Sequence, residues 1–167
     1  MFGIAKMAEL TTLQALLRRS VRLYGDKIAF HIASNNGIQR ITYRKFADDV
    51  EALGTALLHN GSLKGKRVGI IGRNSYEWGA TYFAVMNGGG TVVPLDKELT
   101  AKELGDSIER VKLNTLFYSE DVKEKIEDVR KQAKSTDFIP TWNRTGSLAF
   151  TNLLADGYSL LAQGDVR

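Results

Sequence analysis

The chain has 167 residues, of which 43% are hydrophobic and 25% are charged, and its formal net charge is +4. This length and composition allow one folded core and exclude a disordered or collagen-like chain. The absence of cysteine excludes disulfides, thiolate zinc sites and a cysteine nucleophile. No apolar run approaches the roughly 20 residues of a membrane-spanning helix. We therefore expect a cytoplasmic protein without a membrane span.

The placement of the positive charges argues against a nucleic-acid partner. Lysines and arginines alternate with acidic residues along the chain, and the tightest basic group is Lys64, Lys66 and Arg67. No aromatic side chains alternate with this group to stack on bases. We interpret the charges as a solvated surface.

The first predicted elements are a helix, a β-hairpin and a second helix. Apolar residues recur at helical spacing over residues 12–24 and 43–59. Between these helices, β-rich runs at 27–33 and 38–43 flank Asn35-Asn36-Gly37. Asn-Gly supplies the positive φ angles that tight hairpin turns need, so the two runs are predicted to pair.

From residue 67 onward, short apolar runs alternate with helical patterns. Strands are predicted at 67–72, 91–95, 115–118 and 138–140, and helices at 76–87, 101–111, 122–134 and 151–161. Strand starts recur about every 24 residues, which leaves room for a crossover helix after each strand. The predicted fold class is α/β, a mostly parallel doubly wound sheet with flanking helices and an N-terminal β-hairpin. Its first three strands are expected to be parallel neighbours.

Polar residues near the predicted helix starts are interpreted as caps or solvated faces. Asn74 with Glu77 and Thr100 with Glu103 have the spacing of capping boxes. Helix capping also explains Ser75, which has no neighbouring histidine to activate it as a nucleophile. The carboxylates at positions 48, 49 and 51 are expected to lie on a solvated helix face.

Motifs for phosphate or metal binding are missing. The glycine-containing segments 61–67, 69–72 and 88–90 lack the spacing of a Walker loop or a dinucleotide fingerprint. His31 and His59 lack the spacing of metal ligands. We therefore predict no catalytic residue and no metal site.

Three segments carry a resemblance to a known family. The longest is VGIIGRNSYEWGATYFAVMNGGGTVVPLDKELTAKEL at residues 68–104, supported by GDKIAF at 25–30 and ITYRKF at 41–46. Their order and spacing resemble the adenylate-forming superfamily, especially bacterial long-chain fatty-acid–CoA ligases. Residues 148–166 resemble the segment that these ligases place just before their phosphate-binding loop.

The resemblance implies a domain organisation. Residues 1–167 would be the N-terminal part of the adenylate-forming domain, truncated before the rest of that domain. Residues 1–66 would supply the helix, hairpin and second helix, 67–140 the βαβ core, and 141–167 the tail that leads to the phosphate loop. The expected partner is the downstream part of the same enzyme, and an uncovered apolar surface would favour self-association.

The resemblance also implies an activity for the parent enzyme. Such ligases activate a fatty acid with Mg-ATP as an acyl-AMP and then transfer the acyl group to CoA. The family's phosphate loop, magnesium motif, ribose-binding Asp and catalytic Lys are absent from these 167 residues. The chain alone is therefore expected to be inactive and to bind none of ATP, Mg or CoA tightly.

One peripheral site follows from the same resemblance. Some relatives hold the CoA nucleotide between the loop after the second parallel strand and a basic residue beyond the third. The corresponding positions here are Asp96 and Lys97, with Lys123 or Lys125.

Apart from the resemblance, the residues themselves leave two alternative functions open. The chain could be a complete small nucleotide-binding α/β module or a non-catalytic interaction domain.

Overall fold

A computed structural model describes residues 12–34, 37–142 and 149–164. The predicted turn residues Asn35 and Asn36 lie outside the described residues. The chain divides into two compact units, Met1–Ala47 and Asp48–Arg167, which are described separately.

The first unit contains a helix and a hairpin, as predicted. Helix α1 (Leu13–Tyr24) begins after Thr12, whose hydroxyl accepts a hydrogen bond from the Ala15 amide at 3.0 Å. Strands β1 (Ile28–Ser34) and β2 (Gly37–Thr42) then pair antiparallel. Helix α2 (Tyr43–His59) follows directly, and the Thr42 hydroxyl accepts from the amide of Lys45 at 3.1 Å. Residues of α2 from position 48 onward belong to the second unit.

The second unit is built on a four-stranded parallel sheet with the order β4-β3-β5-β6. Its strands are β3 (Arg67–Ile71), β4 (Thr91–Leu95), β5 (Thr115–Tyr118) and β6 (Asp137–Pro140). Strand β3 pairs with both β4 and β5, so the predicted parallel arrangement of the first three strands is confirmed.

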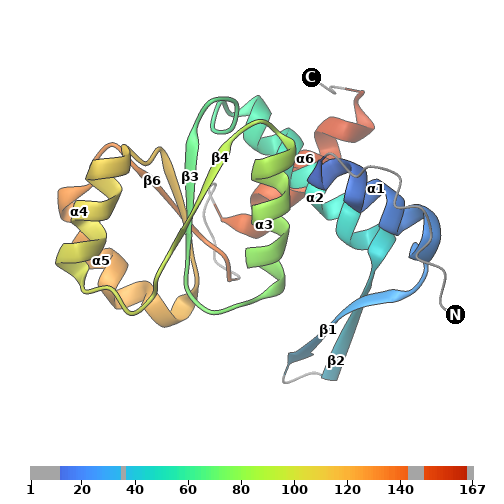
Figure 1. The fold of residues 1–167 in the computed structure, drawn as a ribbon, viewed down its shortest axis with the longest axis horizontal. Coiled ribbons are helices and arrows are strands. Elements are labelled where there is room, and N and C mark those ends of the chain that lie inside the picture. Colours follow the sequence, from blue (N-terminus) through green and yellow to red (C-terminus); the bar gives the residue numbers. More distant parts are fainter. Residues whose placement is uncertain (1–11, 35–36, 143–148, 165–167) are drawn as a thin grey trace, which may run out of the picture. The chain divides into compact units, whose positions relative to one another are not determined.

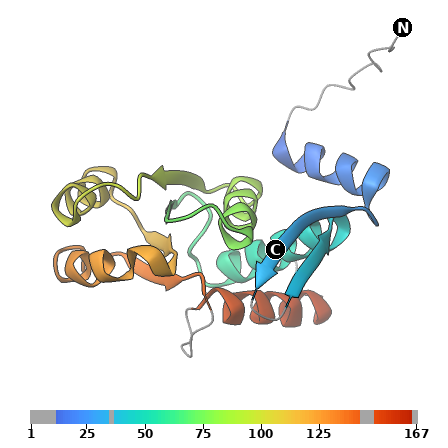
Figure 2. The ribbon, with the colours of Figure 1, turned by 90° about the horizontal axis from the view of Figure 1, so that it is seen from below.

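Helices cover both faces of this sheet (Figures 1 and 2). Helices α4 (Ala101–Val111) and α5 (Lys123–Gln132) lie on one face, where their apolar residues pack with Leu116 and Tyr118 of β5. Helix α3 (Tyr76–Asn87), the second-unit part of α2 and α6 (Phe150–Ala162) lie on the other face. Because side chains alternate along a strand, Phe117 faces this second layer, and it is fully buried.

Of the two predicted capping boxes, one is present and one is not. The Thr100–Glu103 capping box is present, with the Glu103 carboxylate accepting from the Thr100 amide at 2.9 Å. The capping box at Asn74 and Glu77 was wrong, because Ser75 caps α3 and its hydroxyl accepts from the amide of Trp78 at 3.2 Å. Ser75 has the extended backbone of an N-cap, so α3 begins at Tyr76, as predicted, but with Ser75 rather than Asn74 as its cap.

A short 3₁₀ helix (Glu120–Val122) precedes α5, so the helix predicted at 122–134 is shorter than expected. Among the described residues, no helix combines the length and the apolar character that a membrane crossing requires.

Candidate nucleotide-binding edge

All four strands of the parallel sheet end at the same edge. From β3 the chain crosses to β4 on one side, and from β4 it returns past β3 to β5 on the other side. The loops after β3 and β5 therefore diverge at a topological switch point. Open α/β sheets bind their ligands in this place, so the edge is the first candidate for a functional site.

A network of hydrogen bonds lies at the switch point. The Ser119 hydroxyl accepts a hydrogen bond from the Arg73 amide at 3.1 Å and donates one to the Asp121 carboxylate. Gly72 lies beside this hydroxyl with a φ of +126°, and a Cβ at this position would be 1.6 Å from the Ser119 oxygen. The loops after β3 and β5 can therefore approach this closely only because residue 72 is glycine.

The ionisation of Asp121 is stabilised by the same network. Burial acts to raise its pKa, but hydrogen bonds from the Ser119 hydroxyl and the Arg73 amide and the charge of Lys97 outweigh it. The net effect is a pKa below the usual value for aspartate. A fixed negative charge consequently stands at the switch point. The Arg73 amide donates its hydrogen bond to Ser119.

Three of the four predicted CoA-contact residues meet at this edge. Asp96 and Lys97 follow β4, and the Asp96 carboxylate accepts from the Glu98 amide at 2.9 Å. Lys125, in the first turn of α5, donates from its ammonium group to the backbone carbonyl of Lys97. Lys123 is the first residue of α5 and takes no part in this contact.

The charges around this contact have mixed signs. Lys97 lies 3.8 Å from the Glu98 carboxylate, and both side chains are exposed. The pKa of Glu103 is lowered, chiefly by its hydrogen bonds with Thr100 and in smaller part by the charge of Lys125. Each lysine therefore has a carboxylate nearby, which reduces the attraction that it offers to an anion.

A buried polar cluster elsewhere in the second unit corrects a sequence-based expectation. Asp48 and Glu51 are exposed, but Asp49 is only 2% exposed rather than solvated. Its Oδ2 accepts from the Tyr76 hydroxyl at 2.6 Å and its Oδ1 from the Tyr158 hydroxyl at 2.6 Å. Helical spacing gives the reason, because position 49 lies three residues after Phe46 and four before Leu53, on the buried face of α2.

This cluster predicts a loss of stability at alkaline pH. Burial, the hydrogen bond to Asp49 and the charge of Asp49 raise the pKa of Tyr76 well above its ordinary value of about 10. In the unfolded chain Tyr76 ionises near pH 10, whereas in the folded chain it keeps its proton. Its contribution to stability is therefore complete below pH 10 and is lost as the pH rises further.

Urea unfolding between pH 8 and 11.5 tests this expectation with the wild type and Tyr76→Phe. Above pH 10, we expect the unfolding midpoint of the wild type to fall more steeply with pH than that of Tyr76→Phe, since the variant lacks only this titrating group. Parallel curves for the two proteins would contradict the assignment.

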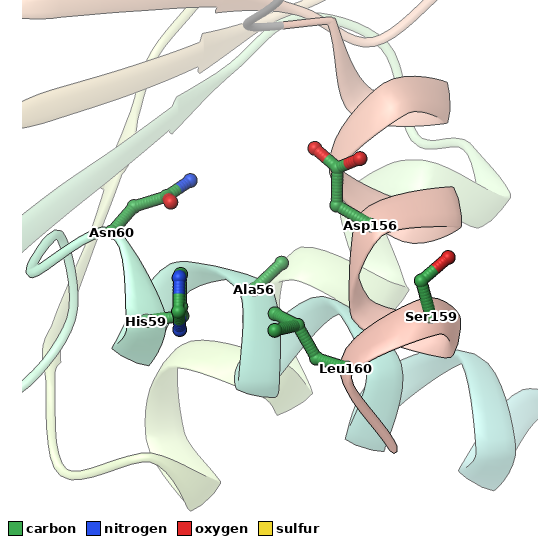
Figure 3. Close-up of a pocket in the computed structure, with 6 residues that line it drawn as sticks. All are labelled: Ala56, His59, Asn60, Asp156, Ser159 and Leu160. Carbon is green, nitrogen blue, oxygen red and sulfur yellow. The ribbon is translucent and has the colours of Figure 1, made fainter. Parts of the chain in front are cut away.

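A shallow groove of about 330 Å³ lies between α2 and α6 (Figure 3). Ala56 and Leu160 give it an apolar side, while Asn60 and Asp156 stand on opposite walls and His59 lies at the end of α2. The part of the chain that the structure describes contains no cluster of three His, Cys, Asp or Glu side chains suited to a metal.

Sequence comparison identifies the class of protein. The family described as AMP-binding enzyme matches residues 17–155, which is most of the chain. The chain belongs to this family, and it covers an N-terminal portion of the adenylate-forming fold.

Two relatives from this comparison illustrate the kinds of protein that the chain resembles. The chain is 29% identical over 106 residues to the mitochondrial medium-chain acyl-CoA ligase ACSF2 of Danio rerio, covering 64% of this chain and 17% of that protein. It is 33% identical over 98 residues to the polyketide synthase–nonribosomal peptide synthetase ffsA of Aspergillus flavipes, covering 59% of this chain and 2% of the synthetase.

Structure comparison agrees with the family assignment. A protein of Rhodopseudomonas palustris assigned as a long-chain-fatty-acid CoA ligase superposes with a TM-score of 0.74 at 25% identity. The alignment covers 85% of this chain and 36% of that one. The chain thus spans well under half the length of each of these relatives.

Proposed function

We propose that these residues form the N-terminal scaffold of a ligase that activates a fatty acid with ATP as an acyl-AMP and transfers the acyl group to CoA. The observation that carries the proposal is the fold around the four-stranded parallel core, which superposes at 25% identity on a protein assigned as a long-chain-fatty-acid CoA ligase. The resemblance of residues 68–104 supports the same substrate class. The chemistry requires ATP because a carboxylate is a poor electrophile until AMP becomes its leaving group.

The residues of the chain fit a supporting role in this reaction. Stabilising a transferring phosphoryl group takes a positioned lysine, a hydroxyl and a metal-binding carboxylate. The motifs that supply them in the family are absent from this sequence. We therefore propose that ATP and Mg bind to other parts of the parent enzyme. We also propose that this enzyme is located in the cytoplasm, where ATP and CoA are available.

The downstream part of the same enzyme is the proposed partner. The first unit exposes large apolar side chains, among them Ile38 at 60% and Leu23 at 51%. Side chains of this kind are usually covered where an interface forms. Without that cover, the chain is expected to self-associate as its concentration rises.

The proposed CoA contacts are Asp96, Lys97 and one of Lys123 and Lys125. The hydrogen bond from Lys125 to the Lys97 carbonyl supports Lys125, because it places the Lys125 ammonium group beside the backbone of Lys97 at one rim of the sheet. Two ammonium groups suit the phosphates of the CoA nucleotide. The neighbouring carboxylates Glu98, Glu103 and Asp121 keep this attraction weak, so its electrostatic part should fade with salt.

Calorimetric titration of the chain with CoA tests this site. We expect weak binding, on the order of millimolar at low salt, which corresponds to about 4 kcal/mol. The double variant Lys97→Gln, Lys125→Gln should weaken binding at least about fivefold, a loss of roughly 1 kcal/mol. Lys134→Gln, which removes an exposed lysine beyond the other end of α5, is the matched control. Equal losses in the control and the double variant, or no binding by the wild type, would contradict the proposed site.

A further inference from the structure

Three helices of the second unit meet at one buried carboxylate. Asp49 of α2 accepts hydroxyl hydrogen bonds from Tyr76 at the start of α3 and from Tyr158 in α6. We propose that Asp49 is a positioning residue that couples the seating of α6 to the loop at the carboxyl edge of the sheet. The identity of this edge as a nucleotide site rests on the proposed function.

The hydrogen bonds of the cluster explain how the Asp49 carboxylate can be buried between these helices. A buried carboxylate is costly unless hydrogen bonds replace its water. Hydrogen bonds from hydroxyl groups to an ionised carboxylate are short and strong, and here each carboxylate oxygen receives one at 2.6 Å. Asp49 therefore holds both tyrosines to defined positions, which an apolar residue of the same size would not do.

On the α3 side, the cluster reaches the edge through only a few residues. Tyr76 is the first residue of α3 and directly follows the cap Ser75. The preceding loop contains Arg73, whose amide donates to the Ser119 hydroxyl at the switch point. A displacement of Tyr76 consequently acts on the loop that joins β3 to α3.

On the α6 side, the cluster lies beside a close approach of α6 to α2. A Cβ at Gly157 would be 1.9 Å from the carbonyl oxygen of Ala52, so α6 packs directly on the backbone of α2. Tyr158 is the next residue along α6. Any shift of α6 against α2 therefore changes the distance between the Tyr158 hydroxyl and Asp49.

Amide hydrogen exchange of the ligand-free chain tests the coupling. The variant Tyr158→Phe keeps the ring and removes one donor to Asp49. We expect its exchange to accelerate about tenfold in α6 and also in residues 73–79, which include the loop before α3, because loss of a hydrogen bond to a buried charged group destabilises the elements that it joins. Exchange in α4 and α5, on the opposite face of the sheet, should stay unchanged.

Two further variants complete the experiment. Tyr82→Phe removes a hydroxyl from the same helix as Tyr76, without a bond to Asp49, and should leave every rate near that of the wild type. Asp49→Asn keeps the size of the side chain but replaces one acceptor by a donor, so it should accelerate exchange in both α6 and residues 73–79.

Acceleration confined to α6 would overturn the proposal, as would an equal rise over the whole sheet. The measurement contains no nucleotide, so its outcome is separate from the CoA titration. Failure of the titration would remove the assigned role of the edge, whereas failure of the exchange experiment would remove the coupling.

Discussion

Replacement of Gly72 by alanine is expected to lower the free energy of unfolding by about 3–5 kcal/mol, since two separate costs add. Gly72 has a φ of +126°, which L-residues rarely adopt. In addition, the new Cβ would be 1.6 Å from the hydroxyl oxygen and 2.7 Å from the Cβ of Ser119. The loops after β3 and β5 must separate to relieve this overlap. Urea unfolding followed by circular dichroism measures the change.

Two control variants separate the costs. Gly61 also has a positive φ, +69°, but a Cβ added there would have no atom within 4 Å. Gly61→Ala should therefore show only the backbone cost, roughly 1–2 kcal/mol. The double variant Gly72→Ala, Ser119→Gly removes the overlapping side chain and should recover part of the loss. If Gly72→Ala cost no more than Gly61→Ala, the close approach at the switch point would be wrong.

Replacement of Gly157 by alanine is the second substitution with a large expected effect. The added Cβ would lie 1.9 Å from the carbonyl oxygen and 2.4 Å from the carbonyl carbon of Ala52. These are backbone atoms of α2, so no side-chain rotation can relieve the overlap and α6 must move. We expect a loss of about 2–4 kcal/mol by urea unfolding, at or above the usual range for overpacking.

Gly79→Ala provides the matched control for Gly157→Ala. Gly79 is also helical, in α3, but a Cβ there would meet no atom within 4 Å. Alanine is the better helix former, so this variant should gain roughly 0.5–1 kcal/mol. The same chemical change is thus expected to act with opposite signs. A stabilising Gly157→Ala would contradict the packing of α6 on α2.

Much of the fold could be predicted because its signals are local. The βαβ core follows from apolar runs and helical spacing within about 24 residues, and the Thr100–Glu103 capping box lies within four. The bounds of α3 were predicted correctly, but the capping box at Asn74 and Glu77 was wrong, because Asn74 and Ser75 are both good capping residues. Only the backbone conformation, which the fold sets, decides between them.

Less of the candidate site than of the fold could be predicted from the sequence. The burial of Asp49 depends on Tyr158, which is 109 positions further along the chain. Its spacing from Phe46 and Leu53 was the one local signal. The network of Ser119 and Asp121 was missed for the same reason, since its partner Arg73 lies 46 positions earlier. The Lys97–Lys125 region was reached through family resemblance, and the structure places the two residues in contact.

We have proposed that these 167 residues support an acid–CoA ligase and that its adenylation chemistry resides in motifs that they lack. A fatty-acid-dependent pyrophosphate-release assay on the chain, with Mg-ATP and CoA present, tests it most directly. We predict no release above the protein-free background, because the phosphate loop, the magnesium motif and the catalytic lysine are absent from the sequence. Measurable pyrophosphate release that depends on both the fatty acid and the chain would contradict the account.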